Sequence, residues 1–137
     1  TPEGADITGS ETILLAEDEY QVRELAVKVL EKAGYKTLVA EDGISATELF
    51  SKEKDRIDLA ILDVIMPEKD GYEVCGELKA DEKLADIPVV LLTAVASHVT
   101  STRYSHRDGM STEADDYIAK PASAEEITQS IKGLLGL

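Results

Sequence analysis

The feature that most constrains this chain is a regular alternation of short apolar runs with segments of helical periodicity. Between the runs, apolar residues recur every three or four positions, which is the spacing of an amphipathic helix. Runs this short, with no polar alternation, are typical of strands that are covered on both faces of a parallel sheet. The pattern therefore predicts an α/β fold. The five runs are 12–16, 36–40, 59–62, 89–92 and 117–119.

The helical segments between these runs have predictable inner faces and ends. The capping-box patterns that begin at Asp70 and Ser123 each mark the start of a helix. The residues expected to face inward are Val22, Leu25, Ala26, Val29, Leu30 and Ala33 in the first helix, which stops near Gly34; Ala46, Leu49 and Phe50 in a second at 44–54; Val74, Cys75 and Leu78 in a third; and Ile127, Ile131, Leu134 and Leu135 in the last.

Five strands that alternate with helices predict one doubly wound domain. Right-handed crossovers leave few ways to wind such a sheet. The flavodoxin-like order 2-1-3-4-5, with helices on both faces, suits this length. We expect residues 12–137 to form the domain and residues 1–11, which are small and polar, to be a flexible lead-in.

Charge and composition exclude several classes of function. The chain has 28 acidic and 14 basic residues, a net charge of −14. A field of this sign repels phosphate backbones, so we expect no direct nucleic-acid binding. No apolar run approaches the ~20 residues that span a bilayer, so no membrane contact is expected. A single cysteine, Cys75, fits a reducing cytoplasm and is interpreted as a small core residue.

Polar side chains follow four of the five predicted strands. Glu17 and Asp18 come after the first, Asp63 after the third, Thr93 after the fourth and Lys120 after the fifth. Because the carboxyl ends of parallel strands meet at one edge, these side chains should lie in one shallow cleft. Singly, each has an ordinary explanation as a cap, turn or surface-loop residue. Their coincidence predicts a functional site.

The residue types at this edge suit phosphoryl chemistry. Three crowded carboxylates repel one another, which should raise the pKa of at least one unless a cation is present. Such oxygen ligands suit Mg²⁺, and one Mg²⁺ with the Lys120 ammonium would balance their charge. In that pocket Asp63 can attack phosphorus in line, while Thr93 can donate a hydrogen bond to the transferred group.

Four stretches make the chain similar to a known family. They are ILLAEDE (13–19), LAILDVIMPEKDGYEV (59–74), VVLLTA (89–94) and ADDYIAKP (114–121). From about residue 12 to 135 the chain resembles the receiver domains of two-component response regulators. The aspartate that ends the third strand, followed by x-x-M-P and then D-G, is highly specific when the other three stretches accompany it in order.

The resemblance implies a role for each residue of the cleft. Asp63 would be the phosphoacceptor, and Thr93 and Lys120 would contact the phosphoryl oxygens. Asp18, Asp63 and the backbone carbonyl of Ile65 would bind Mg²⁺ directly, with Glu17 acting through a metal-bound water. Tyr117 would be the switch aromatic that turns inward as Thr93 moves, and Pro121 matches a family proline that is often in cis linkage.

The resemblance also implies partners. The phosphodonor would be a sensor histidine kinase or a phosphotransfer protein. A downstream protein target would bind the face around helix 4 of the family fold (within 97–112 here), strand 5 (117–119) and helix 5 (the last helix, which begins at Ser123), and a phosphorylation-linked homodimer fits the family. We expect a signalling switch rather than a turnover enzyme. The chain would be either a stand-alone receiver or a piece of a larger regulator or hybrid kinase.

Some positions depart from the family pattern. Glu17 stands where aspartate is commoner, and its longer side chain can still reach a water. Ile65 and Val95 offer no group to orient an attacking water, which predicts a long-lived phosphoryl group. Residues 97–112 lack an apolar stripe, so the fourth helix should be short, displaced or mobile. The basic cluster in this segment, Arg103, His106 and Arg107, is interpreted as a solvated loop or as a partner-docking surface.

Three other functions remain as alternatives. A phosphorylation-independent interaction module of the same fold would have lost part of the polar set. A phosphatase or phosphotransferase with an aspartyl-phosphate cycle would need an acid/base aspartate at position 65, where this chain has Ile65. A flavin-binding module is less well supported, because no hydroxyl-rich phosphate loop follows the first strand.

Overall fold

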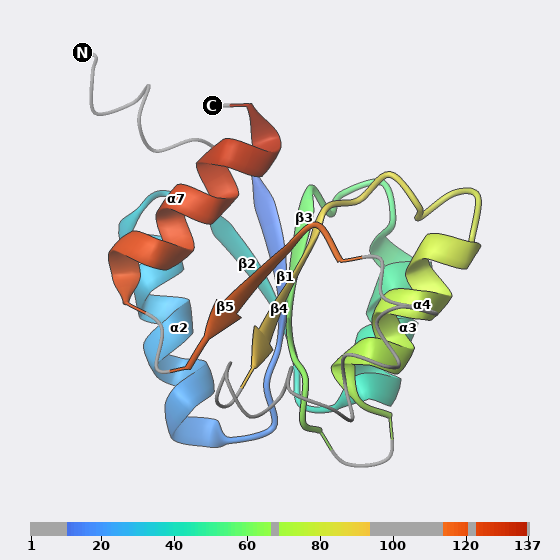
Figure 1. The fold of residues 1–137 in the computed structure, drawn as a ribbon, viewed down its shortest axis with the longest axis horizontal. Coiled ribbons are helices and arrows are strands. Elements are labelled where there is room, and N and C mark those ends of the chain that lie inside the picture. Colours follow the sequence, from blue (N-terminus) through green and yellow to red (C-terminus); the bar gives the residue numbers. More distant parts are fainter. Residues whose placement is uncertain (1–10, 67–68, 94–113, 121–122, 137) are drawn as a thin grey trace.

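The computed structural model describes residues 11–66, 69–93, 114–120 and 123–136, and in this part of the chain strands and helices alternate (Figure 1). None of the helices in these ranges is long and apolar enough to cross a membrane. The elements are β1 (Thr12–Ala16), α2 (Tyr20–Lys32), β2 (Lys36–Ala40), α3 (Gly43–Glu53), β3 (Leu59–Asp63), α4 (Gly71–Ala80), β4 (Val89–Thr93), β5 (Asp116–Ala119) and α7 (Ala124–Leu135).

The five strands form one parallel sheet in the order β2-β1-β3-β4-β5. This confirms the predicted doubly wound topology. In the register, Leu14 of β1 lies between Leu38 of β2 and Ala60 of β3. The two central neighbours, β1 and β3, therefore end side by side, and both deliver their next residues to the same edge of the sheet.

Helices cover both faces of the sheet, with α3 and α4 on one side and α2 and α7 on the other (Figure 1). Alternate residues of each strand point to opposite layers. In β1, Leu14 belongs to the core under α3 and α4, whereas Ile13 and Leu15 belong to the core under α2 and α7. This is why the strand is apolar at every position: all five of its residues are buried.

Most of the predicted inner faces are confirmed. Phe50 of α3, Cys75 and Leu78 of α4 and Ile131 of α7 are each at most 2% exposed. Leu25 was predicted to face inward, and this prediction is wrong, because 65% of the residue is exposed. Five residues at about 100° each place Leu25 roughly 140° around the helix from the buried Leu30, beyond the width of the inner face.

The two predicted capping boxes are also present. Asp70 accepts a hydrogen bond from the Glu73 amide, and the Glu73 carboxylate accepts one from the Asp70 amide. Ser123 and Glu126 form the same reciprocal pair before α7. Each pair satisfies two backbone donors that a helix start would otherwise leave without partners, so the chain turns sharply into the helix at these points.

Gly71 closes the connection between β3 and α4 against the end of β3. Its amide donates to the Val64 carbonyl at 2.9 Å. A Cβ added at Gly71 would lie 2.5 Å from the Asp63 carbonyl oxygen and 2.9 Å from the Val64 Cα. Only glycine permits this approach of backbone to backbone, so the position of Asp63 depends on the absence of a side chain at residue 71.

Several predictions concern residues outside the described ranges. These are most of the flexible lead-in (1–10), the segment 97–112 with Arg103, His106 and Arg107, the role of Val95, and the linkage at Pro121. Glu11, the last residue of the predicted lead-in, is described, and its carbonyl accepts a hydrogen bond from the Lys36 amide at 2.9 Å.

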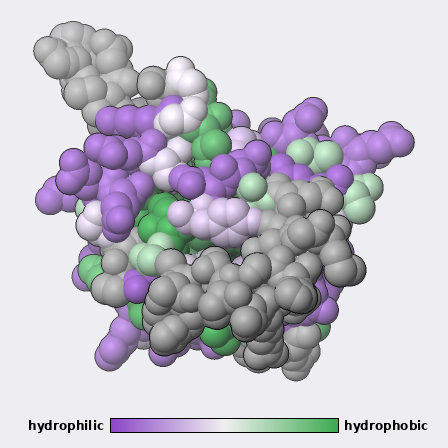
Figure 2. Space-filling view, viewed as in Figure 1, coloured by the Kyte–Doolittle hydropathy of each residue, from purple (hydrophilic) through white to green (hydrophobic). Residues whose placement is uncertain are grey.

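Hydrophilic side chains cover much of the described surface on the face that Figure 2 shows. This agrees with a chain in which 31% of the residues are charged. A groove of about 390 Å³ lies between β5 and α7, with Tyr117, Glu126 and Gln129 among its lining residues. The groove offers an aromatic ring from Tyr117 and hydrogen-bonding side chains from Glu126 and Gln129, which are groups that commonly contribute to protein–protein contacts.

Candidate functional site

Four strand ends bring the predicted polar residues to one edge of the sheet. Glu17 and Asp18 directly follow β1, and Asp63 is the last residue of β3. Thr93 is the last residue of β4, one residue beyond the partner of Asp63 in the register. Lys120 directly follows β5, and its amide donates to the Thr93 carbonyl at 2.7 Å. The convergence of these five residues is thus a result of strand order and strand length alone.

Three carboxylates form the centre of the site. One oxygen from each of Glu17, Asp18 and Asp63 lies within 4.8 Å of the others. Glu17 is fully buried and Asp63 is 3% exposed, whereas Asp18 is exposed to solvent. The cluster therefore has two shielded members and one that faces outward, which leaves it accessible to an ion from one side.

Lys120 is the cation of this site. Its Nζ lies 3.2 Å from Oδ2 of Asp63 and 3.3 Å from Oε1 of Glu17. One ammonium thus bridges the two buried carboxylates. Lys120 comes 103 residues after Glu17, so only the folded sheet brings the pair together.

The electrostatics of the site follow from this geometry. Burial and the repulsion of the nearby Asp63 carboxylate raise the pKa of Glu17 from 4.5 to about 7, against the opposing attraction of Lys120. Burial lowers the pKa of Lys120, but the two carboxylates outweigh it and raise that pKa above its ordinary value. The expectation that crowding would raise at least one carboxyl pKa is confirmed.

Backbone amides hold the carboxylates in place. The Glu19 amide donates to Oε2 of Glu17 at 3.2 Å, and the Ile65 amide donates to Oδ1 of Asp63 at 3.3 Å. Each buried carboxylate therefore has one oxygen directed to a backbone donor and the other to Lys120. The connection after β3 is in this way tied directly to the Asp63 side chain.

Arg23 is a part of the site that sequence reasoning missed. Its guanidinium donates to the Glu17 carbonyl at 2.8 Å, lies over the Tyr20 ring, and the residue is only 8% exposed. It fixes the turn that carries Glu17 and Asp18. A signal was present in the sequence, because Arg23 stands three and seven residues before Ala26 and Leu30, on the inner face of α2.

The donor set fits a divalent cation such as Mg²⁺. Three carboxylates against one ammonium leave two negative charges when all are ionised, which is the charge that one such ion neutralises. Oxygen ligands from carboxylates and a backbone carbonyl are those that Mg²⁺ prefers. The three clustered carboxylates are the groups in the described residues that could hold such an ion, and the predicted roles of the Ile65 carbonyl as a ligand and of Glu17 through a water stay predictions.

The remaining predicted residues lie on the flank of this cluster. Thr93 is 3% exposed on β4, and Tyr117 is 41% exposed on the neighbouring strand β5, paired in register with Leu91. Tyr117 thus has its ring at the surface in this structure. The residues predicted to bind the metal and the phosphoryl group are brought together, and their chemical roles stay a prediction.

Comparisons with known proteins agree on the kind of domain. The family model for the response regulator receiver domain matches residues 13–132. A probable transcriptional regulator, ycf27, from Galdieria sulphuraria is 41% identical over 125 residues, which are 91% of this chain and 45% of that protein. This chain spans about half the length of the curated relatives it matches.

Two solved structures show the same architecture. The signal receiver domain of a signal transduction histidine kinase from Syntrophus aciditrophicus superposes with a TM-score of 0.83 at 36% identity, covering 93% of this chain and 91% of that one. The receiver domain of sensor histidine kinase PA1611 from Pseudomonas aeruginosa PAO1, which has a magnesium ion coordinated in its active site cleft, gives a TM-score of 0.81 at 28% identity, covering 94% and 100%.

Proposed function

Because the chain belongs to the response regulator receiver domain family, we propose that it is a phosphorylation-activated switch in which Asp63 accepts a phosphoryl group. The donor is a sensor histidine kinase or a phosphotransfer protein. One observation carries the proposal: Lys120 joins the Asp63 carboxylate to a cluster of two further carboxylates at the carboxyl edge of the sheet. A carboxylate at such an edge, with a cation beside it, is placed to act as a nucleophile toward phosphorus.

Asp63 is the nucleophile of the transfer step. One carboxylate oxygen forms a new P–O bond in line with the bond that breaks, the P–N bond to the donor histidine, whose nitrogen keeps the electron pair. Lys120 and the Thr93 hydroxyl contact the equatorial oxygens as their charge develops. When bound at Asp18 and Asp63, Mg²⁺ would supply further neutralisation of the negative charge on the transferred group. The product is an acyl phosphate on Asp63 and a free imidazole on the donor.

The phosphoryl group then shifts an equilibrium between two conformations. It adds negative charge at Asp63, which attracts Thr93 and Lys120, and Tyr117 turns inward from its surface position as Thr93 moves. A change from a mostly inactive to a mostly active population needs about 3–5.5 kcal/mol. Two charge-assisted hydrogen bonds of about 1.5–3 kcal/mol each are sufficient. The groove between β5 and α7, which Tyr117 lines, lies on the face that we expect to change shape when Asp63 is phosphorylated.

That face is the proposed contact for a downstream protein or for a second copy of this chain. The matched curated relatives are transcriptional regulators about twice the length of the match. We propose that the domain itself does not contact nucleic acid, because its net charge of −14 repels phosphate. The domain promotes its own modification and does not turn over a substrate.

Ile65 bears on how long the modification lasts. It lies two residues after Asp63, is 57% exposed, and has no polar atom in its side chain. It therefore cannot orient a water for attack on the acyl phosphate. We predict a phosphoryl group that persists for minutes or longer, measured as phosphate release from the purified phosphoprotein. Loss within seconds would contradict this prediction.

The experiment that tests the proposal compares the wild type with Asp63→Asn. Each protein is incubated with acetyl phosphate and Mg²⁺, and intact mass is recorded. We expect one added phosphoryl group in the wild type and none in the variant, which keeps the size of the side chain but lacks the nucleophilic carboxylate. A wild type that gains no phosphoryl group would favour a phosphorylation-independent interaction module.

A further inference from the structure

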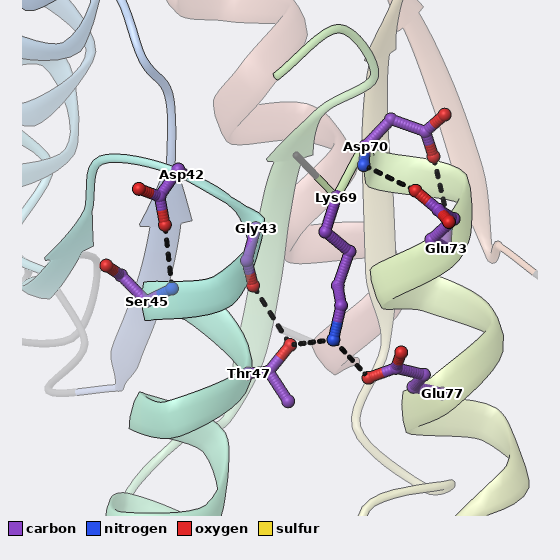
Figure 3. Close-up of polar contacts among 8 residues, drawn as sticks. All are labelled: Asp42, Gly43, Ser45, Thr47, Lys69, Asp70, Glu73 and Glu77. Carbon is purple, nitrogen blue, oxygen red and sulfur yellow. Dashed lines mark hydrogen bonds and ion pairs between the residues drawn. The ribbon is translucent and has the colours of Figure 1, made fainter. Parts of the chain in front are cut away.

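Lys69 connects the segment after β3 to two helices at once. It lies between α3 and α4, and its Nζ is 2.9 Å from Oε1 of Glu77 on α4 and 3.4 Å from Oγ1 of Thr47 on α3 (Figure 3). The Thr47 hydroxyl in turn donates to the Gly43 carbonyl. The Lys69 side chain is 24% exposed, so most of its aliphatic part is covered by protein. The Lys69 ammonium is thus held by two partners, one on each helix.

The backbone of Lys69 is held as closely as its side chain. A Cβ added at Gly43 would lie 1.9 Å from the Lys69 carbonyl oxygen and 2.7 Å from its Cβ. The first turn of α3 therefore rests directly on the backbone of Lys69. Immediately after it, the capping box of Asp70 and Glu73 fixes the start of α4 (Figure 3).

These contacts lead to the Asp63 site over a short distance. Two residues after Lys69, Gly71 packs on the Asp63 carbonyl and donates to Val64. The Ile65 amide, in the same connection, donates to the Asp63 carboxylate. Lys69 is therefore two residues from a glycine that contacts the Asp63 carbonyl and Val64, so a displacement of residue 69 is expected to reach the backbone at the end of β3.

We infer that Lys69 is a positioning residue, which holds the start of α4 so that, through Gly71, the Asp63 carboxylate and the Ile65 carbonyl keep the geometry required by a divalent cation. This inference rests on the proposed function, because the Ile65 carbonyl matters only if the cation binds. The nearest competing role for Lys69 is purely structural, a bridge that stabilises the packing of α3 on α4. The two roles differ in what happens to metal affinity.

The test measures Mg²⁺ affinity by calorimetry for the wild type and for Lys69→Met, which keeps the aliphatic part and removes the ammonium. Partners that orient metal ligands typically contribute 10–100-fold to affinity, and Lys69 acts from further away, so we expect a loss of about three- to tenfold. Lys69→Arg should restore most of the affinity. Lys52→Met is the matched control, because Lys52 is an exposed lysine of α3 that has the same charge but no ion pair among the described residues.

A second readout does not depend on the metal. Amide hydrogen exchange at Ile65 and Gly71, measured by NMR without Mg²⁺, should become faster in Lys69→Met and stay unchanged in Lys52→Met. Thr47→Val and Glu77→Gln each remove part of the Lys69 contact and should give intermediate losses of Mg²⁺ affinity. These milder variants keep the inference testable if Lys69→Met folds poorly.

The outcomes separate this inference from the proposed function. If the wild type binds Mg²⁺ and Lys69→Met binds it within twofold as tightly, Lys69 only stabilises helix packing and the inference is overturned while the proposed function stands. If the wild type itself binds no Mg²⁺, both the metal step of the proposed function and the inference are overturned. An affinity loss equal to that of Lys52→Met would reflect charge alone and would also count against it.

Discussion

Two mostly buried lysines show how a structural contact differs from the site at the sheet edge. Nζ of Lys79, on α4, donates to the carbonyls of Ala85 and Ile87 at 3.1 and 2.9 Å and to the carboxylate of Asp115 at 3.0 Å. Asp115 also accepts a hydrogen bond from the Val89 amide. One positive charge meets one negative charge, and all three donors of the ammonium are used.

Lys120 is in the opposite situation. Its single charge is shared between Glu17 and Asp63, and Asp18 lies nearby with a third carboxylate. The pKa of Glu17 is raised to about 7 because burial and Asp63 disfavour its charged form. The Lys79 contact is therefore complete without a ligand, whereas the Lys120 site has more negative than positive charge, which a bound cation or a proton on Glu17 can balance.

The largest effect expected from this contrast is on metal affinity. Asp18→Asn removes one of the three clustered charges and should weaken Mg²⁺ binding by about a hundredfold, at the upper end of what metal-site partners contribute. Asp115→Asn removes a charge of the same sign from the balanced contact and should leave Mg²⁺ affinity within twofold. Isothermal calorimetry on both variants checks the pair. Equal losses would mean that the cation responds to the net charge of the domain and not to this cluster.

The next effect is on stability. Lys79→Met removes the ammonium donor from two carbonyls and leaves the Asp115 carboxylate with only its hydrogen bond from the Val89 amide, and it should lower the free energy of unfolding by about 2–3 kcal/mol. Lys120→Met in saturating Mg²⁺ should cost less than Lys79→Met, because the metal then supplies positive charge beside Glu17 and Asp63. Urea unfolding followed by circular dichroism measures both. The comparison fails if Lys120→Met is the more destabilising change.

The smallest effect is on the pH dependence of stability without metal. Glu17 keeps its proton up to about pH 7 in the folded chain but loses it near 4.5 when unfolded. Between these values the unfolded state binds fewer protons, so the contribution of Glu17 to stability is full below about pH 4.5 and is lost as pH rises toward 7.

We therefore expect the free energy of unfolding in EDTA to fall by up to about 2 kcal/mol from this source between pH 5 and pH 7.5. Glu17→Gln has no ionisable group at this position, so it should remove this contribution to the fall of the unfolding free energy with pH. Urea titrations of both proteins at several pH values provide the measurement. If the pH dependence of the unfolding free energy is the same in Glu17→Gln as in the wild type, a group other than Glu17 is responsible for it.

Much of the fold could be predicted because it depends on short-range patterns. The all-apolar runs identified the strands, since only strands covered on both faces need no polar positions, and Asp63 and Thr93 were placed at strand ends by where those runs stop. Once the strand order was known, the convergence of Asp18 and Lys120 with them followed from topology. Leu25 was misplaced because helical spacing alone does not fix the width of the inner face.

The contacts that hold the site could not be predicted in the same way. Thr47, Lys69 and Glu77 come together only through the packing of α3 beside α4, and no periodicity in the sequence indicates that one lysine will meet both. Arg23 was readable in principle as a charge on an inner face, but its acceptor, the Glu17 carbonyl, is a backbone atom that has no sequence signal.

The backbone contact between Gly71 and the Asp63 carbonyl has a consequence for how this domain can be altered or can diverge. Positions 65 and 71 lie in one short connection, yet their tolerance of new side chains should be opposite. Residue 65 is 57% exposed and can accept many side chains, so it is available for adjusting the lifetime of a modification. At residue 71 a single methyl group would displace the end of β3. Variation in signalling kinetics within this scaffold should therefore accumulate at residue 65 while residue 71 stays invariant.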